Sequence, residues 1–518
     1  MTTDDTNALI LSIGPALTTT YISQLQEQGV SDAAARKRVQ RATEGYTKLA
    51  GIRFEKNTRF IYRPEDYGTV RFWRNLESAF YTHGKSYWAA ITNLRARGGM
   101  CRRERFTQVS GAPISRKGQL PPDIILERLI AIKMLEEQTF NDQAYVLFQA
   151  AYLRSAPIEL IRANELAEFV ALHGIKEWAR RLGLGSYNKF NMRDEDDPAI
   201  VSGFTFDITA PAYFRPLLQV VNGKPKPGFF ACDINLHDVT DEAAVEAFVR
   251  KCDGAAFSAK VGRIMPVLVA DVFSQKGFEL AKSKGILAIT PETLFGSELA
   301  KALRDLVRLL TDTGATAAVS PDHLSKVLKA LTRIEGASAN IRGALFELVV
   351  GSLVKDVEGG SLKTGFKVAN LSTGEKAEID VQLDKDNHAG FLIVECKAKN
   401  PGGRVSEREV KRWYDNRVPL IHRILNTGFK EVERPFHFEI WTNGIFAASA
   451  LAWLGRQPKE CDGYTVDWKD GAALKTYADR ASNVSLREML REHYFRNPLT
   501  SIAQEHVAVV EGGAPYQS

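Results

Sequence analysis

Apolar residues near the start of the chain recur at the spacing of helices. Four of them share one helical face within residues 15–28: Leu17, Tyr21, Ile22 and Leu25. After a short turn, Ser31 and Asp32 form the polar start that a second helix prefers. The pattern predicts a helix, a tight turn and a second helix over residues 31–46. Two short strands are predicted next, on either side of residues 56–58.

The apolar spacing changes in the middle of the chain. Residues 120–190 carry apolar side chains at helical intervals and predict a helical scaffold. Residues 200–310 instead alternate strand-like runs, such as 204–209 and 228–236, with helix-like runs such as 241–252. Strands that alternate with helices are typical of an α/β sheet. We therefore expect a multidomain α/β protein.

A hairpin pattern over residues 376–399 carries charges where a core strand would not normally hold them. Two apolar-rich segments flank a polar turn. Asp380 interrupts the first segment, and Glu395 and Lys397 follow four apolar residues in the second. Residues two apart share a face of a strand, so Glu395 and Lys397 project together. Burying such charges costs on the order of several kcal/mol each unless they are paired or bind a metal.

These residue types suit the chemistry of a divalent cation. Asp380 and Glu395, on paired strands, offer the oxygen ligands that Mg²⁺ prefers. Such an ion lowers the pKa of a bound water and neutralises charge on a phosphate, and Lys397 can orient or deprotonate that water. An amphipathic helix pattern over residues 341–356 lies upstream, with Glu347 in its middle. The plain alternative is an exposed Glu/Lys pair at the end of a strand.

In their order along the chain, Glu347, Asp380, Glu395 and Lys397 resemble the PD-(D/E)XK nuclease superfamily. The resemblance covers about residues 341–453, and it departs from the pattern in that no proline precedes Asp380. It implies a restriction-endonuclease-like mixed sheet flanked by helices, of the Mrr-like branch, that hydrolyses phosphodiester bonds with Mg²⁺ or Mn²⁺. The roles it implies are metal binding by Asp380, Glu395 and the carbonyl of Cys396, positioning of the attacking water by Lys397, and orientation of the site by Glu347.

Composition narrows the class of protein. The 518 residues are 44% hydrophobic and 25% charged, an ordinary balance for a globular protein. No run of ~18 apolar residues predicts a membrane span, and the polar N-terminus does not look like a signal peptide. The five cysteines are scattered and form no CxxC pair. This disfavours a zinc site or a disulfide framework and indicates a reducing, cytoplasmic location.

Positive charge is concentrated near the N-terminus. Residues 31–110 hold 17 Lys and Arg against 7 Asp and Glu, a local charge of +10, whereas the whole chain carries +6. A basic region on a near-neutral body is typical of proteins that bind nucleic acid. With its helix, turn and basic helix, the stretch 6–67 resembles a winged helix-turn-helix domain, which implies a double-stranded DNA partner. The residues expected to contact DNA are Arg36, Lys37, Arg38, Gln40, Arg41, Lys56, Arg59 and Arg63. The alternative is a basic helical hairpin that packs on another protein surface.

The central α/β region also resembles a restriction-endonuclease-like core. Asp207 stands at the position of the strand Asp, Asp233 at that of the Asp/Glu, and Asn235 at that of the Lys. Because Asn carries no charge, the resemblance implies a degenerate second copy of the nuclease fold. An unrelated α/β domain is the open alternative.

A basic helix pattern follows the hairpin over residues 406–425. It carries Lys411, Arg412 and Arg417. These side chains either contact the DNA backbone or form a solvated face.

The sequence therefore predicts a Mg²⁺-dependent DNA endonuclease, a hydrolase similar to restriction and antiviral defence effectors; the defence role follows from the resemblance alone. Two other functions stay open: a DNA-binding regulatory protein with an inactive nuclease-like domain, and a nuclease for RNA or single strands. No membrane partner is expected, and a homodimer or protein partners in a defence system are compatible with the sequence. The predicted domains are a DNA-binding part at 1–110, the helical scaffold at 120–190, the α/β domain at 200–310, the nuclease domain at 320–500 and a tail at 501–518.

Overall fold

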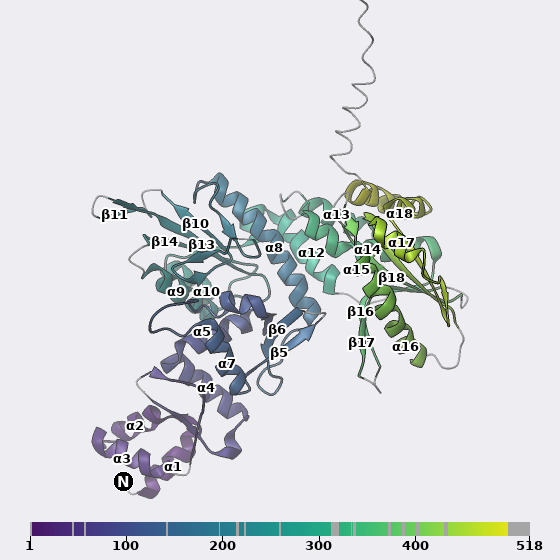
Figure 1. The fold of residues 1–518 in the computed structure, drawn as a ribbon. Coiled ribbons are helices and arrows are strands. Elements are labelled where there is room, and N and C mark those ends of the chain that lie inside the picture. Colours follow the sequence, from purple (N-terminus) through teal and green to yellow (C-terminus); the bar gives the residue numbers. More distant parts are fainter. Residues whose placement is uncertain are drawn as a thin grey trace, which may run out of the picture. The chain divides into compact units, whose positions relative to one another are not determined.

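The computed structural model of this chain contains two compact units, Met1–Ser297 and Glu298–Ser518 (Figure 1). The prediction of a multidomain α/β protein is confirmed, because each unit contains a mixed sheet and helices. Within the described part of the chain, no helix has both the length and the apolar character needed to cross a membrane. The predicted tail lies outside the described residues, which are 3–495 except for gaps at 44–45, 56–57, 141–142, 196, 214–216, 222–223, 258–260, 312–320, 333, 335–337, 371–373, 386–388, 400–402 and 429–433.

The first unit begins with three helices and a small antiparallel sheet. The sheet has the order β1-β3-β2. Tyr21, Leu25, Ala35 and Val39 fill the space between the helices and are almost completely buried. The two predicted helices are confirmed, and Ser31 is the N-cap residue of the second. The elements are α1 (Thr3–Ile13), β1 (Ala16–Leu17), α2 (Thr18–Glu27), α3 (Asp32–Ala42), β2 (Thr47–Lys48) and β3 (Phe60–Tyr62).

Two predictions about the first 190 residues need correction. The strands that pair with β3 are β1 and β2 and not the stretch 51–55. Ile52 and Phe54 in that stretch pack into the hydrophobic core instead of forming a ladder. The expected helical scaffold at 120–190 is interrupted by the hairpin of β5 (Leu135–Phe140) and β6 (Gln143–Phe148). The Glu and Gln residues of β5 suggested a helix, but its exposed face tolerates them in a strand.

A single core also crosses the predicted boundary between residues 1–110 and 120–190. Cys101, Phe106 and Val109 pack in the same buried cluster as Ile125 and Val146, so these segments are one structural body. The aromatic side chains of Phe72, Trp73, Phe80 and Tyr87 are buried in the same cluster. The elements are α4 (Val70–His83), α5 (Lys85–Ala96), β4 (Met100–Arg102), η3 (Arg103–Arg105), α6 (Phe106–Val109), α7 (Pro122–Ala131), β5, β6 and α8 (Ile158–Arg181).

The rest of the first unit is a five-stranded mixed sheet with helices. Its order is β15-β14-β13-β10-β7; β13, β14 and β15 run parallel to one another, and β10 is antiparallel to both β13 and β7. The predicted alternation of strands and helices is confirmed here. The main elements are β7 (Asn191–Met192), β10 (Ile208–Ala212), β13 (Gly228–Asn235), α9 (Glu242–Ala256), β14 (Ile264–Ala270), α10 (Gln275–Ser283), β15 (Leu287–Ile289) and α11 (Pro291–Phe295).

The second unit holds a six-stranded mixed sheet in the order β16-β17-β18-β20-β23-β22. The predicted hairpin is confirmed as β17 and β18. Apolar side chains such as Ile393, Trp413 and Phe438 form its core. The elements are α12 (Ser297–Thr311), α13 (Pro321–Leu331), α14 (Ser338–Glu358), β16 (Ser361–Ala369), β17 (Lys376–Asp384), β18 (Phe391–Lys397), α15 (Glu407–Lys411), η5 (Arg412–Arg417), α16 (Val418–Gly428), β20 (Phe436–Thr442), α17 (Ala448–Leu454), β22 (Glu460–Cys461), β23 (Tyr464–Lys469), α18 (Gly471–Ala478), α19 (Val484–Leu490) and η6 (Arg491–Phe495).

The two sheets follow the same path. In the first unit, β7, β10 and β13 are successively antiparallel, and β14 and β15 then continue in parallel. In the second unit, β16, β17 and β18 are successively antiparallel, and β20 and β23 continue in parallel. In each unit a long helix, α8 or α14, precedes the first of these strands, and helices fill the parallel crossovers.

Candidate active site and nucleic-acid interface

The hairpin of the second unit brings Asp380 and Glu395 together. Val381 pairs with Val394 in the β17–β18 ladder, so the next rung places Asp380 opposite Glu395. The backbone N–H of Cys396 donates a hydrogen bond of 2.8 Å to Asp380 Oδ2. Both carboxylates are buried, at 8% and 5% exposure. The antiparallel register therefore builds the carboxylate pair that the sequence predicted, with one Asp380 oxygen fixed by the backbone.

Two cations face this pair. Lys397 Nζ lies 2.7 Å from Glu395 Oε1, and Arg417 donates to the same oxygen at 2.8 Å. The other Arg417 nitrogen donates to the carbonyl oxygen of Glu378 at 2.8 Å and lies 4.0 Å from Asp380 Oδ1. The side chains of Lys397 and Arg417 are 28% and 30% exposed. The site is therefore open on the side where these two cations lie.

Arg417 was expected at the DNA backbone or on a solvated face, and the structure places it at the carboxylates instead. It ends η5, a stretch of π-helix between β18 and β20. Such widened helical turns are rare and occur often at functional sites. No pattern in the sequence predicts this turn, because its apolar spacing is that of an ordinary helix.

Glu347 lies on α14, within electrostatic reach of the pair. Burial, Glu378 and Glu395 raise the pKa of Glu347 to about 7. Burial, Glu395 and Glu347 likewise raise the pKa of Asp380 well above its usual range. These shifts mean that the two neighbouring cations leave part of the negative charge uncompensated.

Lys397 stays charged in this environment. Burial opposes its charged form, but the attraction of Glu395 and Asp380 is stronger, and the pKa of Lys397 lies above its usual value. An ammonium group donates hydrogen bonds and cannot accept a proton. This geometry favours the positioning role for Lys397 over the alternative in which it deprotonates a water.

The donor set at Asp380 and Glu395 fits a hard divalent cation. Mg²⁺ is commonly held by one or two carboxylates together with waters and substrate oxygens. Burial, Glu395 and Glu347 raise the pKa of Asp380, and a bound cation would oppose that effect. Among the described residues, no three His, Cys, Asp or Glu side chains form a ready metal cage. Cys396 has a buried thiol whose pKa is raised by burial and by Asp380, as expected for a core cysteine on the opposite face.

A basic concavity lies in the N-terminal part of the first unit, between α2, α3 and the small sheet. It has a volume of about 570 Å³. Five of the eight residues expected to contact DNA line it: four lie on α3 and the fifth, Arg59, directly precedes β3. Its polar lining consists of Arg36, Lys37, Gln40, Arg41, Lys48 and Arg59, with Thr18 and Thr43.

The other predicted DNA contacts do not join this surface. Arg38 is half-buried, and one of its guanidinium nitrogens is enclosed without a hydrogen-bond partner among the described residues. Arg63 is engaged by Asp66 and Glu65, at 3.2 Å each. Lys56 lies outside the described residues. The structure therefore divides the predicted set into residues that share one basic surface and residues that do not.

In the central sheet, Asp207 and Asp233 are brought together, but both are occupied. Arg193 donates to Asp207 at 2.9 Å, and Lys251 donates to Asp233 at 2.5 Å. Asn235 is buried and its amide reaches Thr240 at 3.4 Å. Arg193 and Lys251 were not singled out from the sequence, because neither lies in the strand motif.

Comparison with known proteins adds little to this geometry. No protein-family model matches the chain, and no curated protein matches it. A solved structure entitled "Crystal Structure of Protein of Unknown Function AF1548" is 21% identical over 24% of this chain and 58% of that one, with a TM-score of 0.18. The chain thus spans less than two thirds of that protein, and a likeness at this TM-score carries no argument about fold or function.

Proposed function

We propose that the second unit is a restriction-endonuclease-like domain that hydrolyses phosphodiester bonds in DNA with the help of Mg²⁺ or Mn²⁺. The observation that carries this proposal is the facing pair Asp380 and Glu395 with Lys397 2.7 Å from Glu395. A bound divalent ion supplies charge for the phosphate oxygens and lowers the pKa of a bound water. Asp380 and Glu395 are the residues that hold this ion.

The remaining residues of the site, Lys397 and Glu347, have different roles in the reaction. Lys397 donates hydrogen bonds to the attacking water and to the negative charge that develops on the phosphate. Glu347, which lies within electrostatic reach of the pair, orients the site. The water oxygen forms a bond to phosphorus, the bond from phosphorus to one ester oxygen breaks, and that oxygen leaves with a proton.

The N-terminal part of the first unit supplies the DNA-binding surface in this proposal. The order of helices and strands, α1-β1-α2-α3-β2-β3, supports a winged helix-turn-helix, and α3 presents Arg36, Lys37 and Arg41 at the basic concavity. Contacts of this kind to phosphates give affinity without sequence choice. A restriction or antiviral defence role rests on the resemblance of the motif alone.

One observation favours a second function, a DNA-binding regulator whose nuclease site is inactive. Arg417 contacts Glu395 at 2.8 Å and lies 4.0 Å from Asp380. A guanidinium in this position already compensates part of the charge that would attract a metal ion.

Plasmid cleavage tests the proposal directly. We expect the full chain to nick or linearise supercoiled DNA with Mg²⁺ or Mn²⁺, to lose this activity in EDTA, and to lose at least ~100-fold of it in Lys397→Ala. Lys399→Ala is the matched control, because Lys399 pairs with Glu409 and lies outside the carboxylate pair. DNA binding without metal-dependent cleavage would favour the inactive regulator, and cleavage of RNA or single strands alone would favour the other open function.

A further inference from the structure

The two units place their carboxylates on the same rung of the same sheet. In the first unit Ile208 pairs with Cys232, so the next rung places Asp207 opposite Asp233. This corresponds to Asp380 opposite Glu395 in the second unit. The residue after the second carboxylate donates its backbone N–H to the first Asp in both units, at 2.8 Å from Ile234 and at 2.8 Å from Cys396.

The surrounding residues also correspond, with one difference. The preceding helix supplies a glutamate in each unit, Glu168 on α8 and Glu347 on α14. The crossover helix supplies a cation to the second carboxylate, Lys251 in one unit and Arg417 in the other. The first unit adds Arg193, which follows β7 and bridges Glu168 at 2.7 Å and Asp207 at 2.9 Å.

Arg193 and Lys251 complete the hydrogen bonding of three carboxylates, those of Glu168, Asp207 and Asp233. One oxygen of each carboxylate accepts a backbone N–H: from Leu236 for Glu168, from Ile234 for Asp207, and from Asp207 for Asp233, at 2.8–3.1 Å. The other oxygen of each accepts from Arg193 or Lys251. Each oxygen of these three carboxylates already accepts a hydrogen bond, and two cations lie beside them, so the residues of this site do not fit the divalent ion that its sheet position implies.

Burial separates this cluster from the candidate active site. The side chains of its two cations, Arg193 and Lys251, are 7% and 2% exposed, whereas those of Lys397 and Arg417 in the second unit are 28% and 30% exposed. The first site is therefore closed on the side where its cations lie, and a phosphodiester cannot reach it there. The same burial makes each charge costly unless it is fully paired.

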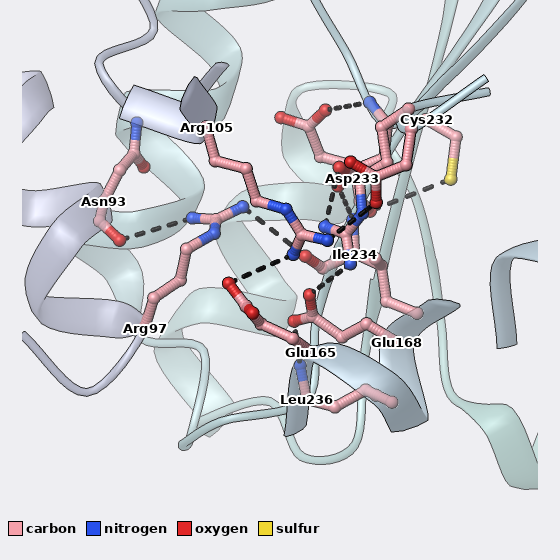
Figure 2. Close-up of polar contacts among 12 residues, drawn as sticks. Asn93, Arg97, Arg105, Glu165, Glu168, Cys232, Asp233, Ile234 and Leu236 are labelled. Carbon is pink, nitrogen blue, oxygen red and sulfur yellow. Dashed lines mark hydrogen bonds and ion pairs between the residues drawn. The ribbon is translucent and has the colours of Figure 1, made fainter. Parts of the chain in front are cut away.

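The cluster continues into the basic N-terminal half of the unit. Figure 2 shows Arg97, at the end of α5, directed toward the carbonyl oxygen of Ile234, at 3.4 Å. It also shows Arg105 beside Glu165 of α8, at 3.3 Å. Ile234 therefore connects the carboxylate cluster to Arg97 of the N-terminal half, since its N–H donates to Asp207 and its carbonyl oxygen accepts from Arg97.

We propose that Arg193, with Lys251, occupies the place of a divalent cation in this site, and that the resulting ion-pair centre fastens the basic N-terminal half to the central sheet. The planar Arg193 fork reaches a helix carboxylate and a strand carboxylate together, as a bridging metal ion would. In this proposal the positive charge of the site comes from its own side chains and not from a bound ion. This inference does not depend on catalysis in the second unit.

Replacing Arg193 tests the proposal in the full chain. The parent carries Glu395→Gln, so that any ion bound belongs to the first unit. We expect this parent to bind no Mn²⁺ in calorimetry at millimolar concentration. Addition of Arg193→Met should lower the melting temperature of the first unit in EDTA by at least about 5 °C. It should also create one Mn²⁺ site, so Mn²⁺ should restore part of the lost melting temperature. Hydrogen exchange of residues 93–105 should rise several-fold in EDTA.

Two further variants keep the test decisive. Arg193→Lys keeps the charge but loses the fork, so it should melt a few degrees lower, by roughly 2–4 °C, even if Arg193→Met does not fold. Asp207→Asn should abolish the created Mn²⁺ site. The proposal fails if the Glu395→Gln parent itself binds Mn²⁺ through Asp207. It also fails if Arg193→Lys and Arg193→Met have the same melting temperature as the parent and bind no Mn²⁺.

Discussion

Arg417 lies beside the carboxylate pair, where its guanidinium group would compete with a divalent ion. It neutralises part of Glu395 and lies near Asp380, and a divalent ion would satisfy the same oxygens. Two positive charges cannot share these oxygens without repulsion. The side chain is 30% exposed and ends a π-helical turn, so it has room to withdraw toward solvent.

We expect Arg417→Gln to raise Mn²⁺ affinity by about tenfold, which corresponds to about 1.4 kcal/mol. The reason is that the variant removes a competing charge and leaves the ligands in place. Isothermal titration calorimetry on the full chain measures the change. Arg412→Gln is the matched control, since it changes an arginine in the same turn. Unchanged or weaker Mn²⁺ binding in Arg417→Gln would show that Arg417 does not compete with the ion.

His237 makes the stability of the first unit depend on pH. It is 4% exposed and lies 3.7 Å from Glu168. Burial, with Arg97 and Arg193, lowers the pKa of His237 to about 4, although Glu168 acts in the opposite direction. In the unfolded chain the pKa of histidine is about 6.5. Between these values the unfolded state binds a proton that the folded state excludes, so stability falls as the pH decreases.

We expect the free energy of unfolding of the first unit to drop by about 2 kcal/mol from this group between pH 7 and pH 5. Chemical denaturation at several pH values measures it. His237→Gln should be less stable at pH 7 but should show a flatter pH profile. An equal slope in the variant would assign the pH dependence to other groups.

At the scale of elements, α14 positions Glu347 by lying close to the sheet. A Cβ at Gly351, one turn after Glu347, would meet Thr364 of β16 at 2.7 Å. A Cβ at Gly343, on the same helix, would meet no atom within 4 Å. Close packing at one glycine and open space at the other provide a matched pair of substitutions.

Gly351→Ala should destabilise the second unit by about 1–2 kcal/mol, because overpacking outweighs the gain in helix propensity. It should also lower metal-dependent cleavage several-fold by shifting Glu347. Gly343→Ala should stabilise the unit by roughly 0.5–1 kcal/mol and leave cleavage unchanged. Thermal melts and plasmid cleavage measure both. Equal behaviour of the two variants would contradict the close contact of α14 with β16.

The basic concavity at α3 gives a prediction about salt. We expect Arg36→Ala/Lys37→Ala/Arg41→Ala to weaken duplex binding by at least ~10-fold near 0.1 M salt and to reduce the slope of log K against log salt by about 2 to 3. Fluorescence anisotropy on a labelled duplex measures this. Arg63→Ala is the control, because Arg63 is engaged by Asp66. A similar loss in the control would place the DNA surface elsewhere.

The two compact units should also behave separately in calorimetry. Two of the buried clusters in the described part of the chain, one around Phe72 and one around Ile393, each contain residues of one unit, which favours two thermal transitions. Excess Mn²⁺ at 100 times its Kd should raise only the transition of the second unit, by roughly 5–10 °C. Glu395→Gln should remove the shift. One cooperative transition, or a shift of both, would contradict this.

Sequence patterns predicted different parts of the molecule with different success. The hairpin and its carboxylates followed from alternation along single strands, since register then brings Asp380 and Glu395 together. The α/β character of the central part followed in the same way. The contacts of Arg193, Lys251 and Arg417 did not, because no alternation along a strand marks these residues. In the sequence, each of them looks like any solvated charge. The hairpin β5–β6 was missed because exposed Glu and Gln residues are compatible with either structure.

The backbone hydrogen bond to the first aspartate of each sheet has a consequence for how such sites can be found and how they can vary. Its donor is the amide of Ile234 in one unit and of Cys396 in the other. A main-chain donor does not depend on the identity of the side chain, so the hydrogen bond itself excludes only proline, which has no N–H. Because Ile234 and Cys396 are both buried, the remaining restriction is that the side chain must fit the core. A sequence search for relatives should therefore accept any residue of core character at the middle position of this motif and exclude proline.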